Sequence, residues 1–298
     1  MVAVGGRRPR CHRSLRARRP VIRLFSAFLM VALLLLGREA PAQVRVSSLG
    51  DQIILIQTPR SNLVASVGPE GAAVVGAVDI ATSDAVADSL RIHVGSPRRF
   101  VIEAAGLASA GQGDAGWDSR GALVVMQEFA VRRMTGPFTS PVRRPRSEFS
   151  QFFSLTLNGE SMHAVRQEPG YATSDMLVHF EKSNVIYLGE SYSGDGYPRI
   201  DTSLGGTVDG LLKTLEPWVQ QSGSRFVGAR GKVASFSDIA AYRDMVRAVS
   251  EEVKSLKSQG RTIAEVVASH PTKSYDAKWG HGVVTAETFV RDLYQSEH

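Results

Sequence analysis

Asn184-Val185-Ile186-Tyr187-Leu188-Gly189-Glu190 is the stretch of the sequence that says most about the fold. Its four consecutive apolar residues follow the turn-forming triplet Lys182-Ser183-Asn184, and this pattern predicts a short buried strand over residues 185–188. A second apolar run lies on the other side of the triplet, at residues 176–180. We therefore predict that the two runs are neighbouring strands joined by a turn.

Short apolar runs alternate with turn residues through the first half of the chain. The tetrapeptide Gly68-Pro69-Glu70-Gly71 predicts a hairpin, and Asn158-Gly159 predicts another tight turn. Ser83 is a candidate N-cap for a helix over residues 83–94, and a short helix is expected from Glu128 onward. Strands are predicted at residues 52–56, 62–67, 72–75, 99–102, 121–126 and 152–157.

Helical periodicity dominates the last third of the chain. Residues 237–259 predict a long helix with Ser237 as its N-cap and one apolar stripe, made of Ile239, Tyr242, Met245, Val246, Val249 and Val253. Further helices are predicted at residues 207–220, 262–268 and 285–295. Strands and helices interleave after residue 42 without a repeat or a flexible linker. This order predicts one layered α/β domain with mixed sheets over residues 43–298.

The N-terminal segment has the pattern of an export signal. Eight arginines without an acid occupy the region up to Arg23, an apolar run follows over residues 24–36, and Ala40-Pro41-Ala42 has the small-x-small form of a cleavage site. We expect residues 1–42 to be a signal peptide, which implies a periplasmic or secreted protein without a stable membrane anchor after cleavage. An uncleaved N-terminal anchor is the alternative, and the choice between Sec and twin-arginine export stays open.

The net charge and the cysteine content of residues 43–298 differ from those of the full chain. The full chain has a formal charge of +6, from 35 basic and 29 acidic residues. Residues 1–42 hold nine arginines and one glutamate, so residues 43–298 hold 26 basic and 28 acidic residues, a net charge of −2. That balance argues against nucleic-acid binding by charge. The single cysteine is Cys11, so the rest of the chain can form no disulfide and no thiolate metal site.

A set of motifs from residue 183 onward carries a family resemblance. Besides residues 184–190, the motifs are Tyr197-Pro198-Arg199-Ile200-Asp201, Gly205-Gly206-Thr207-Val208-Asp209-Gly210, Tyr242-Arg243-Asp244-Met245 and Asp276-Ala277-Lys278-Trp279-Gly280. They resemble motifs of the metallo-β-lactamase superfamily, in its secreted metallo-hydrolase branch. The similarity extends over about residues 45–296. It implies a four-layer αββα sandwich, in which two mixed sheets lie face to face with helices outside.

The resemblance also assigns positions to the zinc ligands of that family, which are a His-x-His-x-Asp-His loop, a later His, a bridging Asp and a last His. Zinc at such sites lowers the pKa of bound water to about 7. Of the counterparts here, only Glu190 can still bind a metal, and no His lies between His93 and His163. We therefore expect no zinc and no other cofactor. In chain order the counterparts are Ala105, Leu107, Ser109, Ala110, Tyr171, Glu190 and Arg230.

Two of these positions are expected to interact. In the family the bridging carboxylate and the last His share one metal, so their side chains converge. A guanidinium at Arg230 would supply the positive charge that the Glu190 carboxylate then lacks. We predict a direct ion pair between Glu190 and Arg230 with Tyr171 close by. The alternative is an Arg230 side chain that turns out to solvent.

Four further residues are candidates for a pocket wall, namely Asp175, Tyr192, Tyr197 and His281. Core packing is the alternative for the two tyrosines, and a structural turn is the alternative for His281. Asp175 together with Asp114 and Asp118 is also a candidate oxygen site for a hard cation.

The sequence leaves three functional interpretations open. The first is a catalytically inactive homologue, or pseudoenzyme, that binds a small molecule or a protein. The second is a hydrolase with an atypical or metal-free active site. The third is a diverged paralogue without a selected activity. The basic loop Arg143-Arg144-Pro145-Arg146 is a weak indication of an anionic partner.

Overall fold

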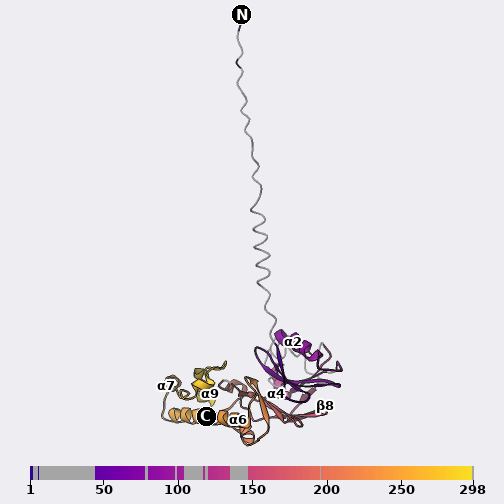
Figure 1. The fold of residues 1–298 in the computed structure, drawn as a ribbon. Helices are drawn as coiled ribbons and strands as arrows, with labels where there is room; N and C mark the ends of the chain where they lie inside the picture. Colours follow the sequence, from indigo (N-terminus) through magenta and orange to yellow (C-terminus); the bar gives the residue numbers. More distant parts are fainter. Residues whose placement is uncertain are drawn as a thin grey trace. The chain divides into compact units, whose positions relative to one another are not determined.

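The computed structural model describes residues 44–77, 80–97, 99–103, 120–134, 147–194 and 196–296, together with Trp117 and residues 1, 2 and 6. The chain divides into Met1–Pro41 and Ala42–His298, and the described helices and strands all belong to the second part (Figure 1). The predicted signal peptide, the small-residue loop after Glu103 and the basic loop 143–146 lie outside the described residues.

Seven described strands form the first sheet: β1 (Arg45–Ser48), β2 (Ile53–Gln57), β3 (Asn62–Gly68), β4 (Gly71–Val75), β5 (Arg99–Glu103), β6 (Leu123–Gln127) and β7 (Ser147–Phe149). They lie side by side in chain order. Strands β1 to β4 pair antiparallel through tight turns, including the predicted turn at Pro69 and Glu70. Strands β4 to β7 pair parallel, so the sheet is mixed.

Five described strands form the second sheet: β8 (Phe152–Leu157), β9 (Glu160–Arg166), β10 (Met176–Phe180), β11 (Val185–Ser193) and β12 (Arg225–Arg230). Their order in space is β12-β11-β10-β9-β8. The turns at Asn158-Gly159 and at residues 182–184 join antiparallel neighbours, as predicted. The last pair, β11 and β12, is parallel and contains register shifts after Tyr187 and after Gly189.

Helices cover the outer faces of both sheets. Helices α2 (Ile80–Arg91) and α4 (Glu128–Met134) pack on the first sheet. The second sheet is covered mainly by α5 (Val208–Leu215), α6 (Phe236–Ser258), α7 (Ile263–Ala268), α8 (Asp276–Trp279) and α9 (Ala286–Ser296), with the 3-10 turns η1 (Thr202–Leu204) and η2 (Glu216–Trp218) between them. The predicted four-layer αββα sandwich with two mixed sheets is confirmed. In the described part of the chain, none of the helices has the length and apolar content that a bilayer crossing requires.

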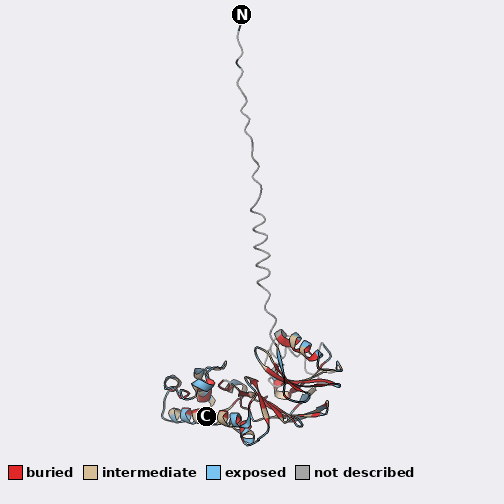
Figure 2. Ribbon diagram, viewed as in Figure 1, coloured by how far each residue is buried: buried red, intermediate tan, exposed pale blue. Residues whose placement is uncertain are grey.

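Three groups of buried apolar side chains hold the layers together. The buried residues are coloured along the ribbon in Figure 2. One group fills the space between the sheets, where Val64, Val75 and Ile102 of the first sheet meet Val178 and Tyr187 of the second. The other two groups lie between each sheet and its helices. Strands β3 and β4 are buried along their whole length. Burial on both faces explains why their sequences are continuously apolar and do not alternate.

Two predicted helix starts are wrong. Helix α6 is capped by Ser235, not Ser237, because Asp238 at the third helical position returns a hydrogen bond to the backbone N–H of Ser235 and completes a capping box. Three residues after Ser237 stands Ala240, which offers no such acceptor. Helix α2 begins at Ile80, so Ser83 lies buried inside the helix rather than at its cap.

Other elements differ from the sequence-based expectation for local reasons. The predicted helix over 207–220 breaks into α5 and η2, because Pro217 has no N–H to continue the helical hydrogen bonds. Strands β1, β7 and β12 and the short α8 were not predicted, and β9 was implied only by the hairpin signal at Asn158-Gly159. The first two strands have only four and three residues, and β12 contains Gly228, which weakens the strand pattern.

Candidate functional site

The predicted ion pair between Glu190 and Arg230 is present. Both residues lie toward the C-terminal ends of the parallel neighbours β11 and β12, so their side chains emerge at the same edge of the sheet. Nη1 of Arg230 donates to one carboxylate oxygen of Glu190 at 2.8 Å, and Nη2 donates to the other at 3.1 Å. Two parallel bonds use the planar fork of the guanidinium fully, which is the strongest geometry for this type of pair.

Burial makes this pair unequal. The Glu190 side chain is 11% exposed, and the Arg230 side chain is 34% exposed. Partial burial lowers the pKa of Arg230, but the attraction and hydrogen bonds of Glu190 outweigh burial and raise it overall. The carboxylate depends more on its partner than the guanidinium does, because only the guanidinium has ready access to water.

The phenol of Tyr171 interacts electrostatically with Glu190 and with Arg230. Its closeness to the pair stays a prediction. Burial is the main reason that the pKa of its phenol rises to about 12, and the negative charge of Glu190 is the next. The phenol therefore stays protonated at neutral pH and can act as a hydrogen-bond donor at this edge of the sheet.

The backbone around Tyr171 is held by the buried carboxylate of Asp175. One oxygen of Asp175 accepts the N–H groups of Gly170 at 3.0 Å and Tyr171 at 2.6 Å, and the other accepts the N–H of Ala172 at 3.1 Å. Burial raises the pKa of Asp175 to about 7, although these three hydrogen bonds lower it. Asp175 thus faces the loop and does not form a wall open to solvent.

A further backbone hydrogen bond holds the loop that contains Tyr171. The carbonyl oxygen of Tyr171 accepts the N–H of Asp201 at 3.1 Å. Gly206 packs so closely on that carbonyl that a Cβ atom there would overlap it. Tyr171 is therefore positioned by its backbone on both sides.

Two polar side chains of the first sheet reach across to the segment that carries Arg230, and the sequence did not single them out. The buried Asn62 donates from Nδ2 to the carbonyl oxygens of Gly228 at 3.1 Å and Gly231 at 3.0 Å. Gln57 donates from Nε2 to Oδ1 of Asn62 at 3.2 Å. An asparagine that opens a strand after a turn looks like an ordinary turn residue, so no local signal reveals this role.

The remaining candidate residues lie elsewhere. Tyr192 packs edge-to-face on Tyr242 with ring centroids 4.9 Å apart, and Tyr197 stacks on Phe289. Both candidate tyrosines are buried in the core under the helices, so they do not line an open pocket. His281 makes a 3.0 Å hydrogen bond to the carbonyl oxygen of Ala277. Ala105, Leu107, Ser109 and Ala110, and also Asp114 and Asp118, lie outside the described residues.

The described side chains at this edge of the sheet do not fit a zinc ion. Zinc sites take three or four nitrogen, sulfur or carboxylate donors around one point. Both oxygens of Glu190 are engaged by Arg230, and both oxygens of Asp175 accept backbone N–H groups. Within the described residues, no group of three or more His, Cys, Asp or Glu side chains is arranged to hold a metal ion. Residues 104–116 add neither histidine nor cysteine.

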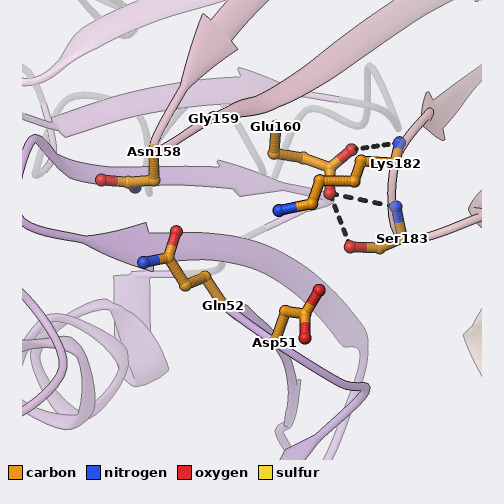
Figure 3. Close-up of a pocket in the computed structure, with 7 residues that line it drawn as sticks. All are labelled: Asp51, Gln52, Asn158, Gly159, Glu160, Lys182 and Ser183. Atoms are coloured by element: carbon orange, nitrogen blue, oxygen red, sulfur yellow. Dashed lines mark hydrogen bonds between the residues drawn. The ribbon is translucent and has the colours of Figure 1, made fainter.

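A cavity of about 530 Å³ lies at the opposite ends of the strands, beside the turns that precede β9 and β11 (Figure 3). The buried carboxylate of Glu160 is aimed at the neighbouring turn, where it accepts the N–H groups of Lys182 at 2.8 Å and Ser183 at 3.2 Å and the hydroxyl of Ser183 at 2.5 Å. Glu160 therefore holds a turn together and is not available for a reaction.

Removal of Arg230 should cost more stability than removal of Glu190. We expect Arg230→Ala to lower the free energy of unfolding by about 2 kcal/mol, because it leaves a nearly buried carboxylate without a partner. Glu190→Ala should cost less than about 1 kcal/mol, because the guanidinium can turn toward water. Urea unfolding of both variants measures the difference. The double variant Glu190→Gln/Arg230→Met is the control and should recover most of the loss. Equal, negligible losses would show that the pair contributes nothing.

Comparison with known proteins gives structural relatives only. No protein-family model and no curated protein matches the chain. A metallo-β-lactamase from Pontibacter korlensis superposes with a TM-score of 0.57 at 11% identity, over 69% of this chain and 99% of that one. DIM-1 metallo-β-lactamase has a TM-score of 0.57 at 10% identity, over 70% and 99%. The inverting sec-alkylsulfatase Pisa1 from Pseudomonas sp. has a TM-score of 0.64 at 12% identity over 85% of this chain, which spans 50% of the sulfatase. These likenesses, together with the two facing mixed sheets and their outer helices, show that this chain has the metallo-β-lactamase fold.

Proposed function

We propose that this chain is an exported, catalytically inactive protein on the metallo-β-lactamase fold, which binds a small molecule or a protein without hydrolysing it. The observation that carries the proposal is the bidentate pair between Glu190 and Arg230. The resemblance assigns the bridging carboxylate and the last His of the family to these two positions. Here the Arg230 guanidinium uses both oxygens of Glu190, which is the only carboxylate among the assigned positions.

The chemistry of the other assigned positions supports the same proposal. Hydrocarbon side chains at Ala105, Leu107 and Ala110 have no lone pair to offer a metal. No histidine lies between His93 and His163, so a shifted alignment supplies no imidazole either. Without a bound metal to lower the pKa of water, hydroxide is scarce at neutral pH. The structural relatives are named for β-lactam and sulfate-ester chemistry, but likeness at 10–12% identity does not extend that chemistry to this chain.

Export is supported by the sequence pattern of residues 1–42. The basic region, the apolar run and the Ala-Pro-Ala site occur in the order that signal peptidase recognises. The absence of cysteine after Cys11 also suits an oxidising compartment, because no free thiol is left to oxidise there.

One preparation tests the proposed export and the proposed loss of the zinc site. The full chain is expressed in a bacterial host, and its periplasmic fraction is purified without added metal. We expect a mature protein that begins at or near Gln43 by intact mass, with less than about 0.1 zinc per chain by elemental analysis, because too few donors converge on one point. Arg230→His is the matched control, and it should also fail to retain zinc, because the other assigned positions remain unchanged. One or two zinc ions retained through dialysis would overturn the inactive assignment, and a mass that includes residues 28–36 would overturn cleavage.

A further inference from the structure

A second cavity lies on the outer side of the first sheet, away from the Glu190–Arg230 pair. Its volume is about 550 Å³, and its described lining residues come from one face of α2, from the first residue of β5 and from the segment before β6. The face of α2 contributes residues at helical spacings of three and four, which brings their side chains to one side. The described lining residues are Asp84, Ala87, Asp88, Arg91, Arg99 and Arg120.

Arginines outnumber acids among the described lining residues of this cavity. Arg120 pairs with Asp84, and Arg91 pairs with Asp88 at 3.2 Å. Arg99 makes no ion pair with a described residue, and its terminal Nη1 has only a 3.4 Å contact with the carbonyl oxygen of Pro97. The described lining residues therefore carry one positive charge that no acid balances.

The hydrogen-bonding capacity of Arg99 is also incompletely used. Its Nε is buried and has no acceptor in the described structure, and the side chain as a whole is only partly exposed. A buried donor without an acceptor costs about 1–3 kcal/mol, and more when the group is charged. Such a group in a native protein calls for a water molecule or an ion that completes its bonds.

We propose that this cavity binds a small oxyanion group, of the phosphate, sulfate or carboxylate type, with Arg99 as its main anchor. The planar guanidinium donates two parallel hydrogen bonds to such a group. Arg91 and Arg120 stand beside it with their charges already shared with aspartates, so they add attraction without a second strong anchor. Asp84 and Asp88 lower the positive potential of the cavity, so binding depends on the directed hydrogen bonds of Arg99 more than on net charge. The proposal does not depend on the Glu190–Arg230 pair.

Anion titrations of the protein purified from cells that express the full chain test this site. Inorganic phosphate, sulfate and acetate represent the three oxyanion types, and chloride at matched ionic strength is the reference. We expect at least one oxyanion to raise the midpoint of thermal unfolding with a saturable dependence on concentration, and the arm that responds identifies the type. Saturation matters, because sulfate and phosphate also stabilise proteins by exclusion from the surface, and that effect grows without a plateau.

Variants assign the response to Arg99. Isothermal titration should show affinity at least about tenfold weaker for Arg99→Ala and a few-fold weaker for Arg91→Ala, because the Arg91 side chain is 73% exposed and already paired. Arg60→Ala removes an exposed arginine elsewhere and should leave affinity unchanged. Arg99→Lys keeps the positive charge but loses the planar guanidinium, so its affinity should be intermediate. This variant replaces Arg99→Ala if the alanine variant does not fold. No saturable response to any oxyanion, or the same affinity in the folded Arg99 variants, would overturn the site.

Discussion

Asp175→Asn is expected to remove a strong pH dependence from the stability of this protein. The Asp175 carboxyl is buried, and its pKa rises from 3.8 to about 7 because burial disfavours the charge more than three backbone hydrogen bonds favour it. Below about pH 3 the group is protonated in both the folded and the unfolded chain. As pH rises from 4 to 7, the unfolded chain releases this proton first, so the unfolded state gains relative stability.

The size of this effect follows from the size of the pKa shift. A shift of one unit corresponds to about 1.4 kcal/mol, so the Asp175 contribution to folding should fall by up to about 4 kcal/mol between pH 4 and pH 8. An asparagine has no proton to release in this range. The difference in unfolding free energy between the parent protein and the variant should therefore change with pH by that amount. The parent protein becomes less stable relative to the variant as pH rises.

Urea unfolding of both proteins at unit steps between pH 4 and pH 8 gives this difference directly. Asp51→Asn is the matched control, because Asp51 is exposed and forms no ion pair with a described residue. Its curve should run parallel to that of the parent protein. Parallel curves for Asp175→Asn as well would show that this carboxyl titrates near its ordinary value, and the three N–H donors would then be the dominant influence on it.

Gly206→Ala is expected to destabilise the protein by about 3 kcal/mol or more. The cause is a close approach between two backbones, because a Cβ at this position would overlap the carbonyl oxygen of Tyr171 and crowd that of Gly170. Backbone atoms cannot swing aside as a flexible side chain can, so the loop that carries Tyr171 must shift. That shift strains the three hydrogen bonds to Asp175.

A substitution at a second glycine distinguishes the effect of steric crowding from the effect of backbone conformation. Gly260 follows α6 with a φ of 81°, and a Cβ there would meet no atom within 4 Å. Gly260→Ala should cost about 1 kcal/mol, the price of a left-handed conformation alone. Urea unfolding of the two variants under the same conditions compares them. A loss at Gly206 no larger than the loss at Gly260 would show that the loop accommodates the extra methyl group.

Elements with strong local signals could be predicted to the residue. Strands β8 and β10 match the predicted residues 152–157 and 176–180, because turn residues bound each apolar run on at least one side. The predicted stripe of α6 is buried in full. Strands β1 and β7 escaped prediction because they have four and three residues and only partly apolar sequences, and pairing with β2 and β6 is what orders them.

The candidate site also has features that the sequence could predict and features that it could not. Glu190 and Arg230 were matched as a pair through the resemblance, although 40 residues separate them, but the bidentate geometry depends on the parallel pairing of β11 with β12. Asn62 lies 166 residues from the Gly228 carbonyl that it supports. No window of sequence contains both partners of such a bond, so local reasoning does not find it.

The sequence by itself determined which chemical groups this protein has, since a chain without histidine between His93 and His163 and without cysteine after Cys11 offers zinc no imidazole and no thiolate from that segment in any fold. It also determined the strands and helices whose signals are local. Only the tertiary structure decided which polar groups meet, that Asp175 holds a loop, and that Tyr192 and Tyr197 belong to the core. The physical reason is that hydrogen bonds and ion pairs depend on distance and burial, and both are properties of the folded chain.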